Sequence, residues 1–335
     1  MSAVPASCAA QAVAMGVQRV VAAGLAHPFG DERTVSQAFP QPISAKQADP
    51  FLMCDNFAMA SSGVAAHEDE FPVDWHPHRG MDLLSYIKSG VGRHGDSMGN
   101  RETFATPGMQ WVSAGSGIEH AEGGGTPAGD TMKGFQIWIN VPSTKKMDDP
   151  RYGTHPPSDI PLIDLGFGAT ARLLAGKLDD SPDYGARGPF QTAANVTMVD
   201  LELAPGAALN HSVPRGLDTA LLYVYEGSAA SINGAPVGPQ SIVQFDAGDD
   251  EARGLDLVAG GKGLAAMLFA GKRLNEPIAW HGPIVMNTQA ELRQCFSELR
   301  AGTFPPIKVE WPGRGGYKIA ANGRKAASAG AAAAT

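Results

Sequence analysis

Two short motifs hold the residues of this chain that could carry out chemistry. They are His76-Pro77-His78-Arg79-Gly80 and Gly115-Ser116-Gly117-Ile118-Glu119-His120-Ala121-Glu122. Residues i and i+2 of a β-strand point to the same face, so His76 and His78 are expected to project together. The same spacing relates His120 to Glu122. Three neutral imidazoles and a carboxylate suit a first-row divalent metal, so the motifs predict one metal site if both strands face the inside of one barrel. An octahedral ion held by four ligands keeps two open positions for chemistry.

Two acidic residues near these motifs are further candidates for the site. Asp82 follows His78 by four residues and is expected on the same strand face. It could be an alternative ligand or could hydrogen-bond a ligand imidazole. The second role is favoured because Asp is one methylene shorter than Glu. Glu119 alternates with His120 and is expected to point away from the metal.

The other histidines are expected outside the site. His94 lies among glycines in Gly92-Arg93-His94-Gly95-Asp96, which predicts an exposed turn. His155 precedes two prolines and is interpreted as a linker residue. His211 stands where a ligand of the second half would be expected, but no second histidine accompanies it. The sequence therefore predicts no metal in the second half, and His281 is interpreted as structural.

Short strands separated by Gly and Pro must position the motifs. In the first half the strand candidates are 83–87, 109–112 and 135–141, and the polar, proline-bearing stretch 143–158 is interpreted as a linker. A second series follows, with candidates at 171–176, 196–203, 219–225, 241–245 and 264–269. Strands at such intervals are typical of a sandwich or barrel. The second half echoes the first, which indicates two copies of one architecture.

One helix is predicted near the C-terminus. Thr288 and Glu291 form a capping box, in which each side chain satisfies a free backbone N–H group. Apolar residues then follow at helical spacing, and Gly302 marks the end. Cys295 on this stripe is interpreted as a buried small hydrophobe. The stretch 320–335 is rich in Ala, Gly and Ser and is expected to be disordered.

Composition limits the function classes and the compartment. The formal net charge is −8 and no strongly basic stripe is present, so direct nucleic-acid binding is not expected. Cys8, Cys54 and Cys295 are too few and too scattered for a disulfide framework, which favours a reducing compartment. No apolar run is long enough to span a membrane, and no basic segment precedes an apolar core near the start. A cytoplasmic or nuclear location is expected, with an organelle as the weaker alternative suggested by the acid-poor start.

The two motifs and several other segments resemble the pirin family of the cupin superfamily. The resemblance covers most of residues 30–305 and includes 49–57, 71–80, 110–122, 134–140 and 270–288. It is most specific where the histidine motifs occur together with His281-Gly282-Pro283-Ile284-Val285-Met286-Asn287-Thr288. Two departures stand out: Asp82 occupies a position where the family commonly has Glu, and the segment Ala58–Phe71 looks longer than usual.

The resemblance implies an all-β fold, with two cupin-type (jelly-roll) β-barrels in tandem and a short C-terminal helix. Residues 1–150 would form the metal-binding barrel. Residues 151–305 would form a second barrel without metal ligands, with its closing helix near 288–301, and residues 306–335 a C-terminal extension. The family's four metal ligands match His76, His78, His120 and Glu122. One divalent ion per chain is implied, with Fe²⁺ favoured and Mn, Ni, Cu or Zn left open.

Two functions are implied by the resemblance. The first is a quercetin 2,3-dioxygenase-type oxygenase, a quercetinase that opens a flavonol ring with O2, in which Glu122 remains a ligand or acts as general base. The alternative is a non-enzymatic, iron-binding, redox-sensitive transcription co-regulator that acts through protein partners. The ligand motifs are intact in both cases and do not decide between them. Several aromatic residues could line a pocket for a flat substrate, but barrel core is the favoured interpretation for each: Phe71, Trp75, Phe104, Trp111 and Phe135.

Overall fold

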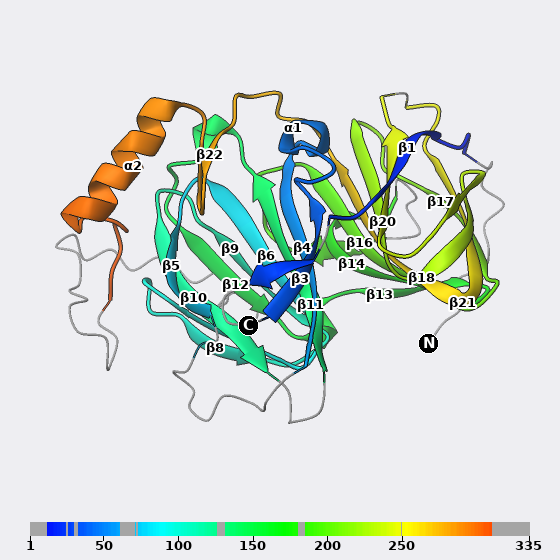
Figure 1. The fold of residues 1–335 in the computed structure, drawn as a ribbon, viewed down its shortest axis with the longest axis horizontal. Helices are drawn as coiled ribbons and strands as arrows, with labels where there is room; N and C mark the ends of the chain where they lie inside the picture. The colour runs from blue at the N-terminus through cyan, green and yellow to red at the C-terminus, as the bar shows by residue number, and fades with distance from the viewer. Residues whose placement is uncertain are drawn as a thin grey trace.

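A computed structural model describes residues 12–24, 26–29, 33–60, 71, 73–125, 131–179, 185–248 and 250–309. Cys8, the stretch 320–335 and residues 61–70 of the segment Ala58–Phe71 lie outside this range. Two β-sandwich-like halves stand side by side in Figure 1. No helix within the described residues is long and apolar enough to cross a membrane.

The first half has two antiparallel sheets. The larger has the order β12 (Arg151–His155), β9 (Gly108–Ser113), β6 (Met81–Ser89), β11 (Thr131–Asn140), β4 (Phe51–Ala60), β3 (Arg33–Phe39) and β2 (Ala26–Phe29). The smaller has the order β5 (Val73–His78), β10 (Ile118–Gly125), β7 (Val91–Asp96) and β8 (Arg101–Phe104). Both histidine motifs lie on the smaller sheet.

The second half is built on a ten-stranded sheet. Its main path is β1 (Gly16–Ala22), β20 (Ser241–Asp246), β18 (Thr219–Ile232), β21 (Gly254–Gly271), β16 (Val196–Leu203), β14 (Ala169–Lys177) and β13 (Leu162–Gly166). Three strands attach beside it: β15 (Arg187–Pro189), β17 (Ala208–Ser212) and β19 (Ala235–Val237). Strand β1 pairs with β20, so a segment expected within the first barrel completes the sheet of the second.

Strand alternation on β11 explains how the two halves meet. Phe135, Ile137 and Ile139 belong to one apolar cluster that also contains Tyr223 and Phe269 from the second half. The intervening residues of β11 point the other way, into the first barrel, as the period of two requires. The larger sheet of the first half therefore buries one face against the second half and keeps the other for the barrel interior. Trp111 and Phe135 lie in this shared core and do not line the barrel.

The predicted linker 143–158 is largely structured, so that interpretation was wrong. It contains the 3₁₀ turns η1 (Ser143–Lys145) and η2 (Pro157–Asp159) and, between them, strand β12. The buried ring of Tyr152 belongs to an apolar cluster of the first half, and Trp111 Nε1 lies 3.2 Å from His155 Nε2. These contacts favour pairing of β12 with β9, which extends the first barrel beyond residue 150.

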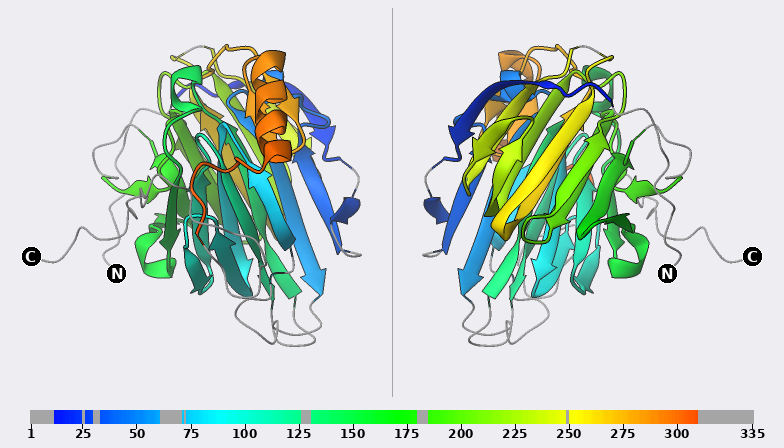
Figure 2. Two further views of the ribbon diagram at one scale, coloured as in Figure 1. Left: turned by 90° about the vertical axis from the view of Figure 1, so that its left-hand side faces the viewer. Right: turned by 90° about the vertical axis from the view of Figure 1, so that its right-hand side faces the viewer.

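The C-terminal helix forms as predicted but packs in an unexpected place. Helix α2 (Gln289–Ala301) has the Thr288–Glu291 capping box and ends at Gly302, whose φ is 70°. It packs on the hairpin of β22 (Ala279–His281) and β23 (Ile284–Met286), and β23 contacts β5. Figure 2 shows α2 against the outer end of the first barrel, away from the second. The only other α-helix in the described residues is the single turn α1 (Ala45–Ala48).

Candidate metal centre

The pairing of β5 with β10 brings the two histidine motifs together. His76 lies directly opposite His120 in the antiparallel register, and His78 lies opposite Ile118. Directly opposed residues share a face, so His76 and His120 project from neighbouring strands into the barrel. The predicted meeting of the two motifs is confirmed for the three histidines.

A glycine turn makes this arrangement possible. Gly80 ends the first motif with φ of 77°, a left-handed conformation that L side chains rarely adopt. A Cβ at this position would lie 2.1 Å from the backbone oxygen of Val285. The backbone N–H of Gly80 donates to the Gly115 carbonyl at 3.0 Å, and this hydrogen bond connects the first motif to the second.

The three histidines form a compact group. Their candidate ligand nitrogens all lie within 4.8 Å of one another, and the Nε2 atoms of His76 and His120 are 3.0 Å apart. Two nitrogens at about 2.1 Å from one ion and at right angles to each other would stand roughly 3 Å apart. The observed spacing therefore fits two adjacent positions around a single metal ion.

Burial keeps two of these imidazoles neutral. It lowers the pKa of His78 and of His120 well below the ordinary histidine value, and the neighbouring histidine charge lowers both further. The neutral form is the one that binds metals. Within the described residues, Nε2 of His78 is buried without a hydrogen-bond partner. Such a nitrogen is costly unless something binds it, so the donor set fits a divalent ion.

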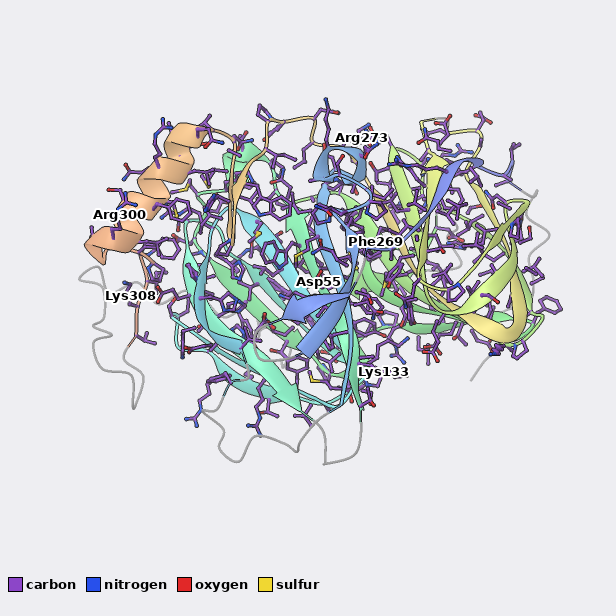
Figure 3. The ribbon with its side chains drawn as sticks, viewed as in Figure 1. Asp55, Lys133, Phe269, Arg273, Arg300 and Lys308 are labelled. Atoms are coloured by element: carbon purple, nitrogen blue, oxygen red, sulfur yellow. The ribbon has the colours of Figure 1, made fainter. Side chains whose placement is uncertain are left out.

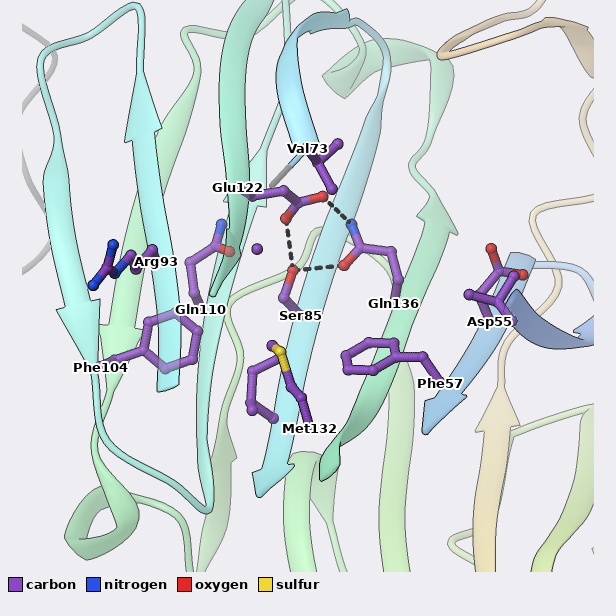
Figure 4. A pocket seen from close by; sticks show the side chains of 13 residues that line it. Asp55, Phe57, Val73, Ser85, Arg93, Phe104, Gln110, Glu122, Met132 and Gln136 are labelled. Carbon is purple, nitrogen blue, oxygen red and sulfur yellow. Dashed lines mark hydrogen bonds between the residues drawn. The ribbon is translucent and has the colours of Figure 1, made fainter. Parts of the chain in front are cut away.

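Glu122, the fourth predicted ligand, lies beside this group but is held by other residues. Its Oε1 is 4.0 Å from His120 Nε2. Ser85 Oγ donates to its Oε2 at 3.0 Å, and Gln136 Nε2 donates to its Oε1 at 3.3 Å, as Figure 4 shows. The register between β10 and β5 shifts here, with the extra residue on β5, so Glu122 lies opposite Val73 whereas His120 lies opposite His76. Its role as a ligand stays a prediction.

Beyond Glu122 a pocket opens inside the first barrel. The space inside it that water-sized molecules can occupy is about 50 Å³. Its polar lining includes Ser85, Gln110, Glu122 and Gln136, which Figure 4 places around one centre. Apolar side chains complete the wall: Val35, Phe57, Val73, Ile87, Phe104 and Met132. Of the five aromatic residues that the sequence offered for such a pocket, Phe104 alone is among the described residues that line it.

Asp82 does not support a ligand imidazole, so that expectation was wrong. The chain turns at Arg79 and Gly80, and Asp82 lies on β6, not on the ligand strand β5. Its buried carboxylate accepts a hydrogen bond from Ser113 Oγ at 2.6 Å. Burial raises its pKa, and hydrogen bonds from Ser113 and Thr192 oppose that rise. Asp82 therefore joins β6 to β9 and to the start of the second half.

His94 is fully buried, contrary to the predicted exposed turn. It lies on β7 opposite Glu122, stacks on Tyr152 with centroids 4.4 Å apart, and lies 5.4 Å from the His120 ring. Its Nε2 is 3.0 Å from Asp96 Oδ2. The i, i+2 spacing of His94 and Asp96 was the available signal, but the flanking glycines obscured it.

The remaining histidines are placed as follows. His155 lies on β12 and not in a linker. His211 is buried in the second half, and its ring nitrogen Nε2 is 3.0 Å from the Leu178 carbonyl oxygen. His281 is exposed on β22 and contacts the Phe296 ring edge. Among the described residues, the group of three that could hold a metal is the one formed by His76, His78 and His120.

Comparison with known families decides what kind of protein this is. The Pirin family profile matches residues 32–139, and the Pirin C-terminal cupin domain profile matches residues 198–305. This chain belongs to the pirin family. Membership confirms both the resemblance noted in the sequence and the expected fold of two cupin domains in tandem with a short C-terminal helix.

Relatives of this pirin cover most of its length. It is 34% identical over 262 residues to Pirin-like protein 2 of Arabidopsis thaliana, which covers 77% of this chain and 76% of that protein. It is 33% identical over 273 residues to a pirin-like protein of Caulobacter vibrioides, covering 78% and 89%. The structure resembles that of a quercetin 2,3-dioxygenase from Acinetobacter baumannii, with a TM-score of 0.74 and 26% identity, covering 88% of this chain and 99% of that one.

Proposed function

We propose that this pirin is a metal-dependent dioxygenase that opens the heterocyclic ring of a flavonol with O2. The observation that carries the proposal is the position of Glu122, between three closely spaced histidines and a pocket with apolar walls. The similarity of the whole chain to a solved quercetin 2,3-dioxygenase supports a flavonol as the substrate class.

In this proposal His76, His78, His120 and Glu122 hold one divalent ion, with Fe²⁺ favoured. A bound ion would supply Lewis acidity toward the flavonol 3-hydroxyl group and a path for electrons to O2. The buried, neutral imidazoles of His78 and His120 have lone pairs free to bind it. Packing also restrains the His78 ring, which lies nearly perpendicular to the Trp138 ring with centroids 5.2 Å apart.

Glu122 is the residue that we propose as the catalytic base. Its carboxylate lines the pocket, so a hydroxyl group of a bound flavonol could reach it. Ser85 and Gln136, which line the same pocket, hold the carboxylate by hydrogen bonds. The apolar wall formed by Phe57, Ile87 and Met132 would bind the flat ring system and exclude water.

The test is metal analysis of the purified protein followed by an oxygen-uptake assay with quercetin. We expect close to one metal ion per chain and O2 consumption that His78→Ala abolishes. His281→Ala is the matched control, because this exposed histidine lies outside the cluster, and it should retain activity. A stoichiometry near two would contradict the assignment of one site to the first barrel.

The same experiment separates the two functions implied by the family. Metal-loaded protein whose iron changes oxidation state, but which consumes no O2 with a flavonol, would contradict the dioxygenase. That outcome would favour the alternative, a redox-sensitive co-regulator that acts through a protein partner.

A further inference from the structure

The C-terminal hairpin and helix lie against the end of the ligand strand. We call residues 279–304, which include β22, β23 and α2, the C-terminal strap. The backbone N–H of Val285 donates to the Arg79 carbonyl at 3.0 Å, and a parallel bridge joins Arg79 to Ile284. Figure 2 shows α2 crossing this end of the first barrel. A segment that begins some 200 residues later in the sequence thus bonds to the residue next to His78.

A buried lysine joins the strap to the turn after the first motif. Lys146 is 1% exposed, and its Nζ donates to the Gly80 carbonyl at 2.6 Å, to Asn140 Oδ1 at 2.5 Å and to the Val285 carbonyl at 3.2 Å. Burial lowers its pKa to about 8, so the ammonium group is still charged at pH 7. Three acceptors satisfy its three N–H bonds, as a buried charge requires. Lys146 therefore joins the turn at Gly80, which follows the first motif, to Val285 of the strap.

Arg79 links both ligand motifs to α2. Its Nε donates to the Ser116 carbonyl of the second motif at 2.8 Å, and its Nη2 donates to Glu298 Oε2 at 2.5 Å. Its guanidinium lies 4.9 Å from the centre of the Phe304 ring. The Arg79 side chain is 5% exposed, so this ion pair is screened less than a surface pair. A shift of α2 would therefore act on the backbone of both motifs.

Aromatic packing continues the contact to a ligand ring. His78 meets the Trp138 ring edge-on, and Trp138 in turn contacts Trp280 of the strap with centroids 6.1 Å apart. The strap thus touches the surroundings of His78 through backbone, ionic and aromatic contacts.

We infer that the C-terminal strap supports the metal centre of the first barrel through its buried contacts with Arg79, Lys146 and Trp138, and that Arg79 is the positioning residue. Groups that orient metal ligands without touching the ion commonly change metal affinity by roughly 10- to 100-fold. Because binding free energies are linked, a strap that strengthens metal binding must itself dock more tightly when metal is bound. The inference rests on the metal site proposed above, but it does not depend on the dioxygenase reaction.

The test uses full-length Glu298→Ala protein and Co²⁺ as the probe. Chelator competition measures Co²⁺ affinity, and hydrogen exchange measures protection of the α2 amides with and without the metal. We expect Co²⁺ to slow exchange in residues 289–301 of the wild type, and Glu298→Ala to weaken Co²⁺ binding about tenfold while reducing that protection. Arg300→Ala, an exposed change on the same helix, is the matched control and should leave the affinity unchanged.

Two results would overturn the inference. One is faster α2 exchange in Glu298→Ala with Co²⁺ affinity within twofold of the wild type, which would make the strap merely structural. The other is wild-type α2 exchange that does not respond to Co²⁺. If Glu298→Ala is poorly folded, Glu298→Gln, which keeps the shape and removes the charge, replaces it under the same two criteria. If Co²⁺ binding and α2 protection respond as expected but the protein does not turn over a flavonol, only the proposed enzyme activity is contradicted.

Discussion

Ser85 Oγ donates a hydrogen bond to Glu122 Oε2 over 3.0 Å, from a strand of the opposite sheet of the same barrel. Gln136, on the neighbouring strand of that larger sheet, lies within 2.5 Å of Ser85 Oγ and also bonds to Glu122. The larger sheet therefore determines where a carboxylate of the ligand sheet lies.

We predict that these two hydrogen bonds orient Glu122 for metal binding. Ser85→Ala combined with Gln136→Met should weaken divalent-metal affinity by about tenfold, because an unrestrained carboxylate loses its preferred orientation. Gln110→Met is the control, since Gln110 lines the same pocket and has no hydrogen bond to Glu122 among those described. Chelator competition measures the affinities. Equal metal affinities in the wild type, the double variant and Gln110→Met would contradict the prediction.

His94 should contribute to stability more than to metal stoichiometry. His94→Phe keeps a ring stacked on Tyr152 but removes the partner 3.0 Å from Asp96 Oδ2, inside the barrel. Loss of one partner of a buried polar pair should lower the unfolding free energy by about 1–3 kcal/mol. Urea denaturation of the metal-free protein measures this, with His281→Phe as an exposed control. Unchanged stability with loss of metal would instead make His94 part of the metal site.

His211 should make stability depend on pH. Burial lowers its pKa from 6.5 to about 4 in the folded protein. Both states are neutral above pH 6.5, so the full contribution is present there. As pH falls from 6.5 toward 4 the unfolded state binds a proton first, and stability is lost. Between pH 7.5 and pH 5 the loss from this residue should be roughly 2 kcal/mol.

The His211 contribution can be isolated with one variant. His211→Gln removes the titrating group and keeps a side chain that can donate to the Leu178 carbonyl. The loss of unfolding free energy between pH 7.5 and pH 5 should be smaller in the variant than in the wild type, by roughly 2 kcal/mol. An identical pH dependence in the two proteins would show that His211 is not the group responsible.

Asp82→Ala tests the corrected role of that carboxylate. Because Asp82 bonds to Ser113 and lies away from the ligand strand, the variant should lose about 1–3 kcal/mol of stability. Its metal affinity should stay within about twofold of the wild type, since changes to groups that orient ligands commonly cost at least 10-fold. Thermal denaturation and chelator competition measure the two effects. A large fall in affinity at preserved stability would restore the original expectation of a supporting role.

The sequence alone predicted the parts of this protein that depend on short-range spacing. The i, i+2 pairs placed His76 with His78, and the capping box placed helix α2 to within a residue or two of its observed ends. These features are visible in a single sequence because neighbours along the chain set them. The double-barrel fold also followed, through the family resemblance carried by the same motifs.

Only the tertiary structure decided what surrounds the site. The strand register placed His76 opposite His120, the packing of the two sheets placed Glu122 against Ser85, and β7 brought His94 into the barrel. The turn at Gly80 separated Asp82 from the ligand strand, and residues some 200 positions later came to lie on Arg79. Such contacts depend on pairing between distant strands and on side-chain packing, which local spacing does not determine.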